Sequence, residues 1–173
     1  SEIISNLYIS DKQHVPIFYS DYDLIVNCTP DIPFPIFCNL TIRIPVHDHP
    51  SYAKKMYSLI KQTYVLESIH KHLRAGKTVL VHCRAGVQRS CAVVACYLVK
   101  YCGMTVDHAI SLIRHKRPIA FYAPFRIEDA KSNRSNPFIS TPAFINKSMG
   151  RLNEKWCKSV NFMETIQNVH INK

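Results

Sequence analysis

The chain contains few acidic residues, few glycines and no long apolar run. Its 12 Asp and Glu stand against 22 Lys and Arg, so the 173 residues carry a formal net charge of +10 at pH 7. With 4 Gly and 10 Pro it is not a fibrous or low-complexity chain, and 47% hydrophobic residues are enough for one globular core. The basic charge favours anionic ligands, although it also fits a surface that is merely solvated, and no nucleic-acid-binding motif accompanies it.

The cysteines lack the pattern of a disulfide framework or of a metal site. There are 7, an odd number, and no two are spaced as CxxC. This usage predicts reduced thiols, and we expect a cytoplasmic location with the nucleus as the alternative. No stretch of 18 apolar residues occurs, so no transmembrane segment is expected, and residues 1 to 6 do not look like a secretory signal.

Short β-rich runs alternate with helical patterns along the first two thirds of the chain. The runs typical of strands are residues 7–9, 24–28, 41–46 and 78–82. Residues 52–74 place apolar side chains at steps of three and four, which predicts one amphipathic helix with Ser51 as its cap. The alternation predicts an α/β fold in which helices cover a sheet.

Two further helices are expected after the last of these strands. Residues 89–102 are apolar on nearly every face and end at Gly103, which predicts a buried helix that stops at the glycine. Thr105 is a candidate N-cap for the second helix. The helical pattern that follows it stops at Arg117-Pro118.

The amino-acid composition changes near Ser132, where the chain becomes polar and basic with isolated aromatic residues. We therefore predict a catalytic domain over residues 1–132 and an appendage over residues 133–173, with a helix over about 151–168. The appendage is expected to pack on its own domain, to form a homodimer or to bind a partner protein.

The stretch from Val81 to Ser90 carries the chemistry, because it lies where a predicted strand gives way to a buried helix. A tight loop at such a junction turns backbone N–H groups inward, and the helix N-terminus adds partial positive charge, so a phosphate group is held without a metal ion. The residues expected to bind the phosphate are Arg84, Ala85, Gly86, Val87, Gln88 and Arg89.

Cys83, at the base of this loop, is the candidate nucleophile because the same field stabilises its thiolate. Arg89, which follows it in the pattern CX5R, can present two parallel donors to phosphate oxygens, which a lysine cannot. Ser90 can donate a hydrogen bond to the Cys83 sulfur and favour the thiolate as nucleophile and as leaving group. The alternatives are a buried structural thiol for Cys83 and a plain helix-start hydroxyl for Ser90.

The segment His82-Cys83-Arg84-Ala85-Gly86-Val87-Gln88-Arg89-Ser90 resembles the signature loop of the dual-specificity protein phosphatases, within the cysteine-dependent protein tyrosine phosphatase superfamily. Other segments similar to that family are residues 6–9, 25–29, 44–49, 97–105 and 117–118. The resemblance covers about residues 3–130. It implies a central mixed sheet flanked by helices, and hydrolysis through a phosphocysteine with no cofactor and no metal.

The resemblance also assigns roles outside the loop. By its place in residues 44–49, Asp48 is the general acid that protonates the leaving oxygen and then activates water. The chemistry of the residues alone does not separate Asp48 from Asp31, Asp107 or Asp129. His82 is implied to order the loop backbone and not to act as a base.

Two departures from the family pattern stand out, namely Gln88 in place of a small hydroxyl residue and the lack of Pro-Asn in residues 119–125. The expected substrates are proteins phosphorylated on tyrosine, serine or threonine, because no segment that deepens the pocket for tyrosine is present. The alternatives are a phosphatase of an RNA 5′ end, a phosphoinositide or a glycan, and a phosphate-binding pseudoenzyme or scaffold.

Overall fold

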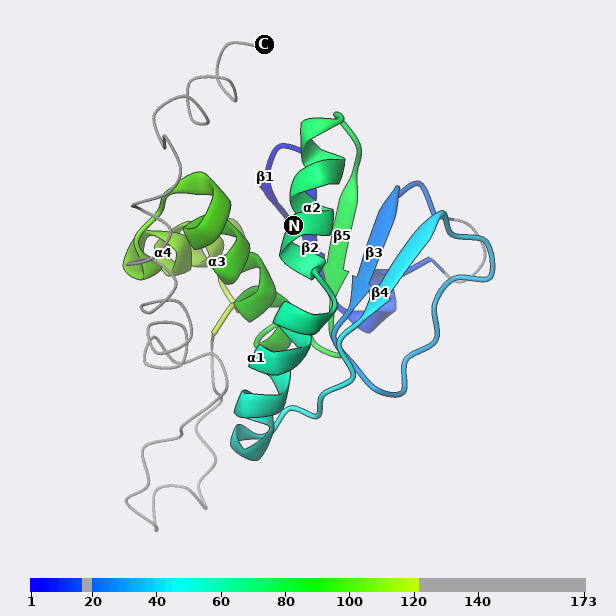
Figure 1. Ribbon diagram of the computed structural model, residues 1–173, viewed down its shortest axis with the longest axis horizontal. Helices are drawn as coiled ribbons and strands as arrows, with labels where there is room; N and C mark the ends of the chain where they lie inside the picture. Colours follow the sequence, from blue (N-terminus) through cyan, green and yellow to red (C-terminus); the bar gives the residue numbers. More distant parts are fainter. Residues whose placement is uncertain (17–19, 122–173) are drawn as a thin grey trace.

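The computed structural model describes residues 1–16 and 20–121, which form a five-stranded sheet and the helices packed on it (Figure 1). The strands are β1 (Glu2–Ile4), β2 (Leu7–Ser10), β3 (Leu24–Asn27), β4 (Leu40–Arg43) and β5 (Val79–His82). Their order is β1-β2-β5-β3-β4, and only the β1–β2 pair is antiparallel. The predicted mixed sheet is confirmed.

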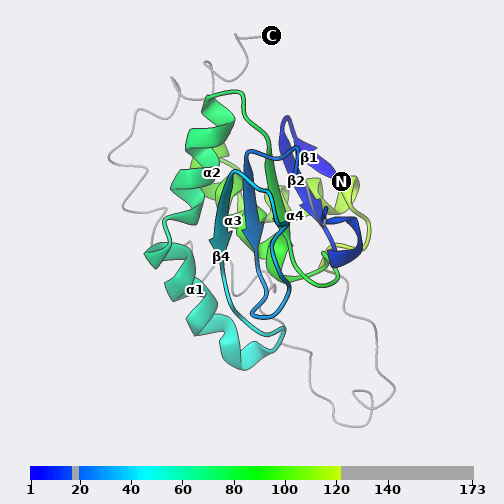
Figure 2. The same ribbon diagram turned by 90° about the vertical axis from the view of Figure 1, so that its right-hand side faces the viewer.

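The helices within the described residues lie on one side of this sheet (Figures 1 and 2). They are α1 (Ala53–Gln62), α2 (Val65–Arg74), α3 (Arg89–Cys102) and α4 (Val106–Lys116). Of the two short 3-10 turns, η2 (Pro50–Tyr52) leads into α1, and η1 (Lys12–His14) lies on the opposite side of the sheet (Figure 1). No helix of the described part of the chain is long and apolar enough to span a membrane.

The strands follow the predicted runs with two differences. Strand β1 was not predicted, because three residues carry too little pattern; it pairs with β2 through a turn in which Asn6 has a φ of 64°. The run 41–46 was predicted too long, since β4 ends at Arg43. Ile44 still donates to the Asn27 carbonyl at 2.9 Å, but Pro45 has no N–H with which to continue the ladder.

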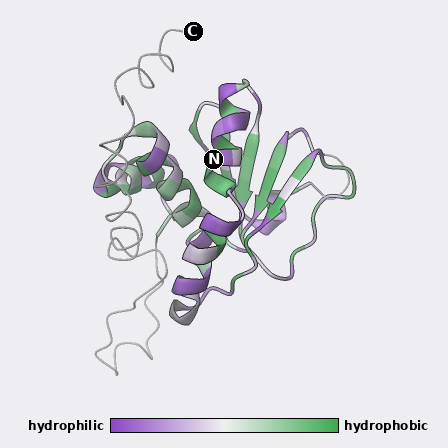
Figure 3. Ribbon diagram, viewed as in Figure 1, coloured by the Kyte–Doolittle hydropathy of each residue, from purple (hydrophilic) through white to green (hydrophobic). Residues whose placement is uncertain are grey.

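The α3 helix is the centre of the core, as its all-round apolar sequence predicted. Its residues 90–99 are all buried, and it ends at Gly103, which has a φ of 66°. The Thr105 hydroxyl caps α4 by accepting a hydrogen bond from the His108 N–H at 3.2 Å. Figure 3 shows α3 and the strands as mainly hydrophobic, whereas α1 and α2 carry both kinds of residue.

The prediction of one helix over residues 52–74 was wrong. The segment forms α1 and α2, which are separated at Tyr64 by a left-handed backbone with a φ of 52°. In a continuous helix of 100° per residue, Met56 and Val65 would point to opposite sides, yet both are fully buried. The break allows both to face the core. Ser51 was also wrongly predicted as the cap, because its hydroxyl bonds the ring of His49 at 2.8 Å.

The predicted domain boundary at residue 132, the appendage over residues 133–173 and its helix over about 151–168 all lie outside the described residues. The same is true of most of the altered segment 119–125. Neither prediction is tested by the structure.

Candidate active site

The loop over residues 83–88 joins the end of β5 to the start of α3, as predicted. Cys83 is the first residue of this loop and only 1% of it is exposed. Its Sγ accepts a hydrogen bond from the Gly86 N–H at 3.2 Å and lies 3.3 Å from the Ser90 hydroxyl oxygen. Both contacts stabilise negative charge on the sulfur.

Arg89 connects the loop to the segment that carries Asp48. Its Nη1 donates to the Val46 carbonyl oxygen at 2.8 Å, and its Nε lies 3.7 Å from the Asp48 Oδ2. The arginine is 5% exposed, so the contact with the Val46 carbonyl fixes the direction of the guanidinium. The result is a positive charge and a carboxyl group side by side, next to the loop over residues 83–88.

The Asp48 side chain is about one third exposed, and burial raises the pKa of its carboxyl group while the charge of Arg89 partly opposes this shift. A carboxyl group whose pKa is raised keeps its proton to a higher pH, as a general acid requires. Of the aspartates that sequence reasoning left open, Asp31 pairs with Arg84, Asp107 lies in the first turn of α4, and Asp129 lies outside the described residues. Asp48 is the one that lies beside Arg89.

Arg117 supports the loop, but sequence reasoning gave it no role in the site and used it only as the end of a helix and as part of a segment that resembles the family. Its Nε donates to the Gly86 carbonyl at 2.6 Å, and its Nη2 donates to the Ala85 carbonyl at 3.3 Å. The C=O and N–H of a trans peptide point in opposite directions. By holding the Ala85 carbonyl outward, Arg117 therefore aims the Gly86 N–H inward at the Cys83 sulfur.

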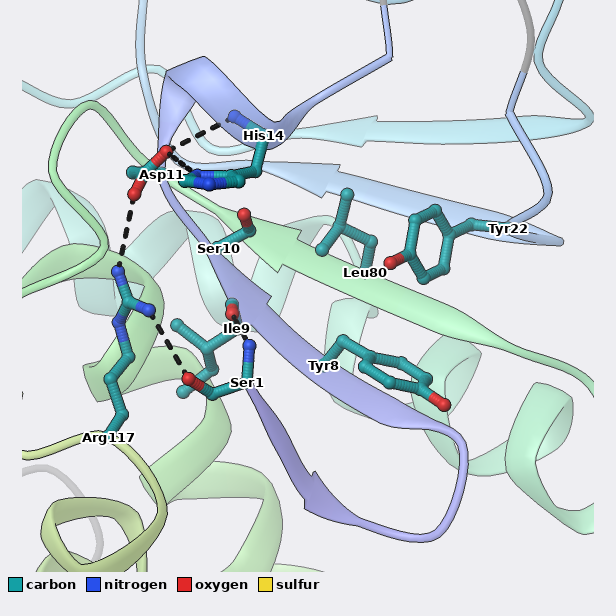
Figure 4. Close-up of a pocket in the computed structure, with 9 residues that line it drawn as sticks. All are labelled: Ser1, Tyr8, Ile9, Ser10, Asp11, His14, Tyr22, Leu80 and Arg117. Carbon is teal, nitrogen blue, oxygen red and sulfur yellow. Dashed lines mark hydrogen bonds and ion pairs between the residues drawn. The ribbon is translucent and has the colours of Figure 1, made fainter.

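Asp11 holds Arg117 in turn, with its Oδ2 3.7 Å from the Nη2 (Figure 4). Asp11 also accepts bonds from the Gln13 and His14 N–H groups and so caps η1. A polar cavity of about 330 Å³ lies beside this pair; it is lined by Arg117 but not by Cys83. No local sequence pattern signals the support, because Arg117 and Gly86 are 31 residues apart.

Further bonds fix the remaining peptides of the loop. The Lys12 N–H donates to the Arg84 carbonyl at 3.1 Å, and the Phe121 N–H donates to the Val87 carbonyl at 2.8 Å. The Cys91 thiol donates to the Gly86 carbonyl at 3.4 Å. The loop is therefore preorganised by elements on both sides of it.

The remaining predicted residues lie beneath or within this loop. His82 is fully buried at the end of β5, and burial lowers its pKa to about 4, so its ring is neutral near pH 7. Gln88 is 4% exposed, at the N-terminus of α3. The six cysteines of the described residues are all free thiols. Among the described residues, no group of three or more His, Cys, Asp or Glu is arranged to hold a metal ion.

The sheet, the loop between β5 and α3, and the placement of Cys83 and Arg89 agree with the arrangement that the resemblance to the cysteine-dependent phosphatases implies. Comparison with known families agrees, because the model of the dual specificity phosphatase catalytic domain matches residues 7–125. The chain belongs to this family.

Individual relatives and structures extend this result. Protein 123R of Invertebrate iridescent virus 6, named as a candidate tyrosine phosphatase, is 32% identical over 128 residues, which are 70% of this chain and 82% of the viral protein. The phosphatidylglycerophosphate phosphatase PTPMT2 of Arabidopsis thaliana is 42% identical over 67 residues, but these are 39% of this chain and only 29% of the plant protein. The crystal structure of human DUSP28 has a similar fold, with a TM-score of 0.69 at 21% identity over 88% of this chain and 97% of that one.

Proposed function

We propose that the chain hydrolyses proteins phosphorylated on tyrosine, serine or threonine through a phosphocysteine at Cys83, without a metal ion. The observation that carries the proposal is the Cys83 sulfur held by the Gly86 N–H and the Ser90 hydroxyl, with Arg89 and Asp48 adjacent. Membership of the dual-specificity phosphatase family supports phosphorylated substrates.

In the first step the loop N–H groups and Arg89 bind the substrate phosphate, and the Cys83 thiolate attacks phosphorus. The S–P bond forms as the P–O bond to the leaving group breaks, and Asp48 donates its proton to the departing oxygen. Arg89 stabilises the negative charge on the phosphoryl oxygens during this transfer.

In the second step the Asp48 carboxylate takes a proton from a water molecule whose oxygen attacks phosphorus. The S–P bond breaks, inorganic phosphate leaves and the Cys83 thiolate is restored. Ser90, 3.3 Å from the sulfur, stabilises this leaving thiolate. Asp48 is protonated again and the cycle is complete.

A phospholipid substrate is the second candidate. It is favoured by the similarity to the plant phosphatidylglycerophosphate phosphatase, although the match spans less than a third of that protein. The same two chemical steps apply to a phosphate monoester of a lipid. A panel of phosphopeptides and of vesicles that contain phosphatidylglycerophosphate or phosphoinositides separates the two candidates.

The decisive experiment is hydrolysis of an aryl phosphate by the parent chain in EDTA, compared with Cys83→Ser and Asp48→Ala from pH 5 to 8. We expect the parent to be active and Cys83→Ser to be inactive. Hydrolysis by Asp48→Ala should be roughly 100- to 10,000-fold slower than by the parent, which is the usual effect of losing a general acid. A parent chain that binds phosphopeptide but is inert in every buffer would reject catalysis and leave a phosphate-binding module.

A further inference from the structure

Arg84 is the residue that follows the nucleophile, and its guanidinium pairs with the carboxylate of Asp31. Asp31 belongs to the loop after β3 and is 53 residues away in sequence. Both side chains are about half exposed, at 50% and 55%. The ion pair therefore lies on the solvent-facing rim of the phosphate-binding loop, beside Cys83.

Both partners stand on backbone that is fixed by other bonds. The carbonyl of Arg84 accepts from the Lys12 N–H at 3.1 Å. On the other side, the amide of Asn27 donates to the Ile32 carbonyl at 2.7 Å and the Ile32 N–H donates to the Thr29 hydroxyl at 3.2 Å. The guanidinium can thus exchange Asp31 for another anion by side-chain rotation alone.

The energetics favour such an exchange. An ion pair between two half-exposed side chains contributes little to stability, because water screens the charges and two side chains must be ordered. The planar guanidinium binds carboxylates and phosphates through paired N–H donors, so an anion of either kind on a bound substrate is an equivalent partner. Arg89, by contrast, is buried and held by the Val46 carbonyl.

We propose that Arg84 binds a second anionic group of a phosphopeptide, a carboxylate or phosphate close to the scissile phosphate, and that Asp31 competes with it. Asp31 is then a specificity-determining residue that lowers the preference for acidic substrates. This inference rests on the proposed function for the scissile phosphate, and it adds the charge of the flanking residues to it.

The test uses two phosphotyrosine peptides that differ only in Glu or Gln at the positions flanking the phosphotyrosine. For the parent, Asp31→Asn, Arg84→Gln and the double variant, kcat/KM is measured for each peptide at low salt. The inhibition constant of each peptide against aryl phosphate hydrolysis is measured as well. Asp107→Asn is the matched control, because it removes one exposed carboxylate at the start of α4.

We expect Asp31→Asn to increase the Glu-to-Gln ratio of kcat/KM by about 2- to 5-fold, the size of an exposed ion pair, and the increase to shrink at high salt. Asp107→Asn leaves the ratio unchanged. Arg84→Gln lowers the ratio, and Asp31→Asn has no further effect in that background. The ratio cancels any loss that both peptides share.

An unchanged ratio in Asp31→Asn with both peptides hydrolysed overturns the inference and leaves the proposed function intact. If neither peptide is hydrolysed but their inhibition constants follow the expected ratio, the inference stands and the proposed function fails. If Asp31→Asn changes the hydrolysis of phosphatidylglycerophosphate in vesicles but changes neither peptide's kcat/KM, the phosphopeptide is rejected as the ligand.

Discussion

The Nε of Arg117 donates to the carbonyl oxygen of Gly86 at 2.6 Å, so a residue beyond the end of α4 controls the loop that begins at Cys83. The same guanidinium holds the Ala85 carbonyl, whose peptide directs its N–H at the sulfur. Arg117 is thus placed to act through the backbone on Cys83, the nucleophile of the proposed mechanism. The fold supplies this contact by packing α4 against α3 and β1.

Replacement of Arg117 is the first prediction. Arg117→Gln leaves two loop carbonyls without their charged donor. We expect kcat/KM for an aryl phosphate to fall about 10- to 100-fold when it is measured at a temperature well below the melting temperature of the variant. Arg117→Lys keeps the charge but not the paired donors and recovers only part of the activity. Arg114→Gln, at an exposed position of α4, is the control. Equal activity of Arg117→Gln and Arg114→Gln would contradict the positioning role.

The second prediction compares two glycines with similar backbone. Gly86 and Gly76 have φ values of 64° and 70°, so alanine is strained at both. A Cβ on Gly86 would lie 2.7 Å from the Ser10 carbonyl oxygen, whereas nothing lies within 4 Å at Gly76. We expect Gly76→Ala to cost about 1 kcal/mol of unfolding free energy and Gly86→Ala more than about 2 kcal/mol, with loss of activity. Urea unfolding of both variants measures the difference, and equal costs would mean that the close contact is unimportant.

The third prediction concerns the strained residue between α1 and α2. Tyr64 has a φ of 52° and a side chain that is 67% exposed, so glycine removes strain and loses little burial. We expect Tyr64→Gly to stabilise the chain by about 1 kcal/mol, which raises the melting temperature by roughly 4 °C. Ser58→Gly, within α1, is expected to lower stability by about 0.5 kcal/mol. A lower melting temperature for Tyr64→Gly would show that the break is not strained.

The fourth prediction follows from the raised pKa of Asp48. Because burial raises this pKa, the protonated acid persists to a higher pH than for an ordinary aspartate. Above the pKa of Asp48 the acid is ionised, and we expect kcat/KM for a substrate with a poor leaving group to fall about tenfold per pH unit. In Asp48→Asn this decline with pH disappears and the activity is low throughout. A decline that persists in Asp48→Asn would assign it to another group.

The fifth prediction concerns acid stability. The pKa of His82 is lowered from 6.5 to about 4 in the folded chain, so between these values the unfolded chain binds a proton that the folded chain does not. Stability is therefore lost as the pH falls from 6.5 to 4, by on the order of 3 kcal/mol from this residue. His82→Asn should show a smaller loss over that range in urea unfolding, whereas His115→Asn, at an exposed position, should match the parent. An unchanged loss in His82→Asn would exclude the buried histidine as the cause.

Elements whose signal is local were predicted with nearly correct bounds. The apolar segment that became α3, its glycine stop at Gly103 and the cap at Thr105 are each written within a few neighbouring residues. The prediction of one helix over residues 52–74 was wrong because it used the spacing of the apolar residues but not the direction in which each apolar face would point. The spacing is helical on both sides of Tyr64, but in one continuous helix the two apolar faces would point in different directions, and the break at Tyr64 turns both to the core.

The α/β class, the loop from Cys83 to Arg89 and the buried helix behind it could all be predicted from the sequence, because adjacent residues encode them. Residue chemistry left several aspartates open, and the resemblance to a family pointed to Asp48; the folded structure then placed Asp48 beside Arg89. Which arginine supports the loop and which carboxylate pairs with Arg84 became known only from the folded structure. These relationships join residues that are distant along the chain. They depend on where the sheet and the helices place each backbone segment, and no local pattern of residue types records that placement.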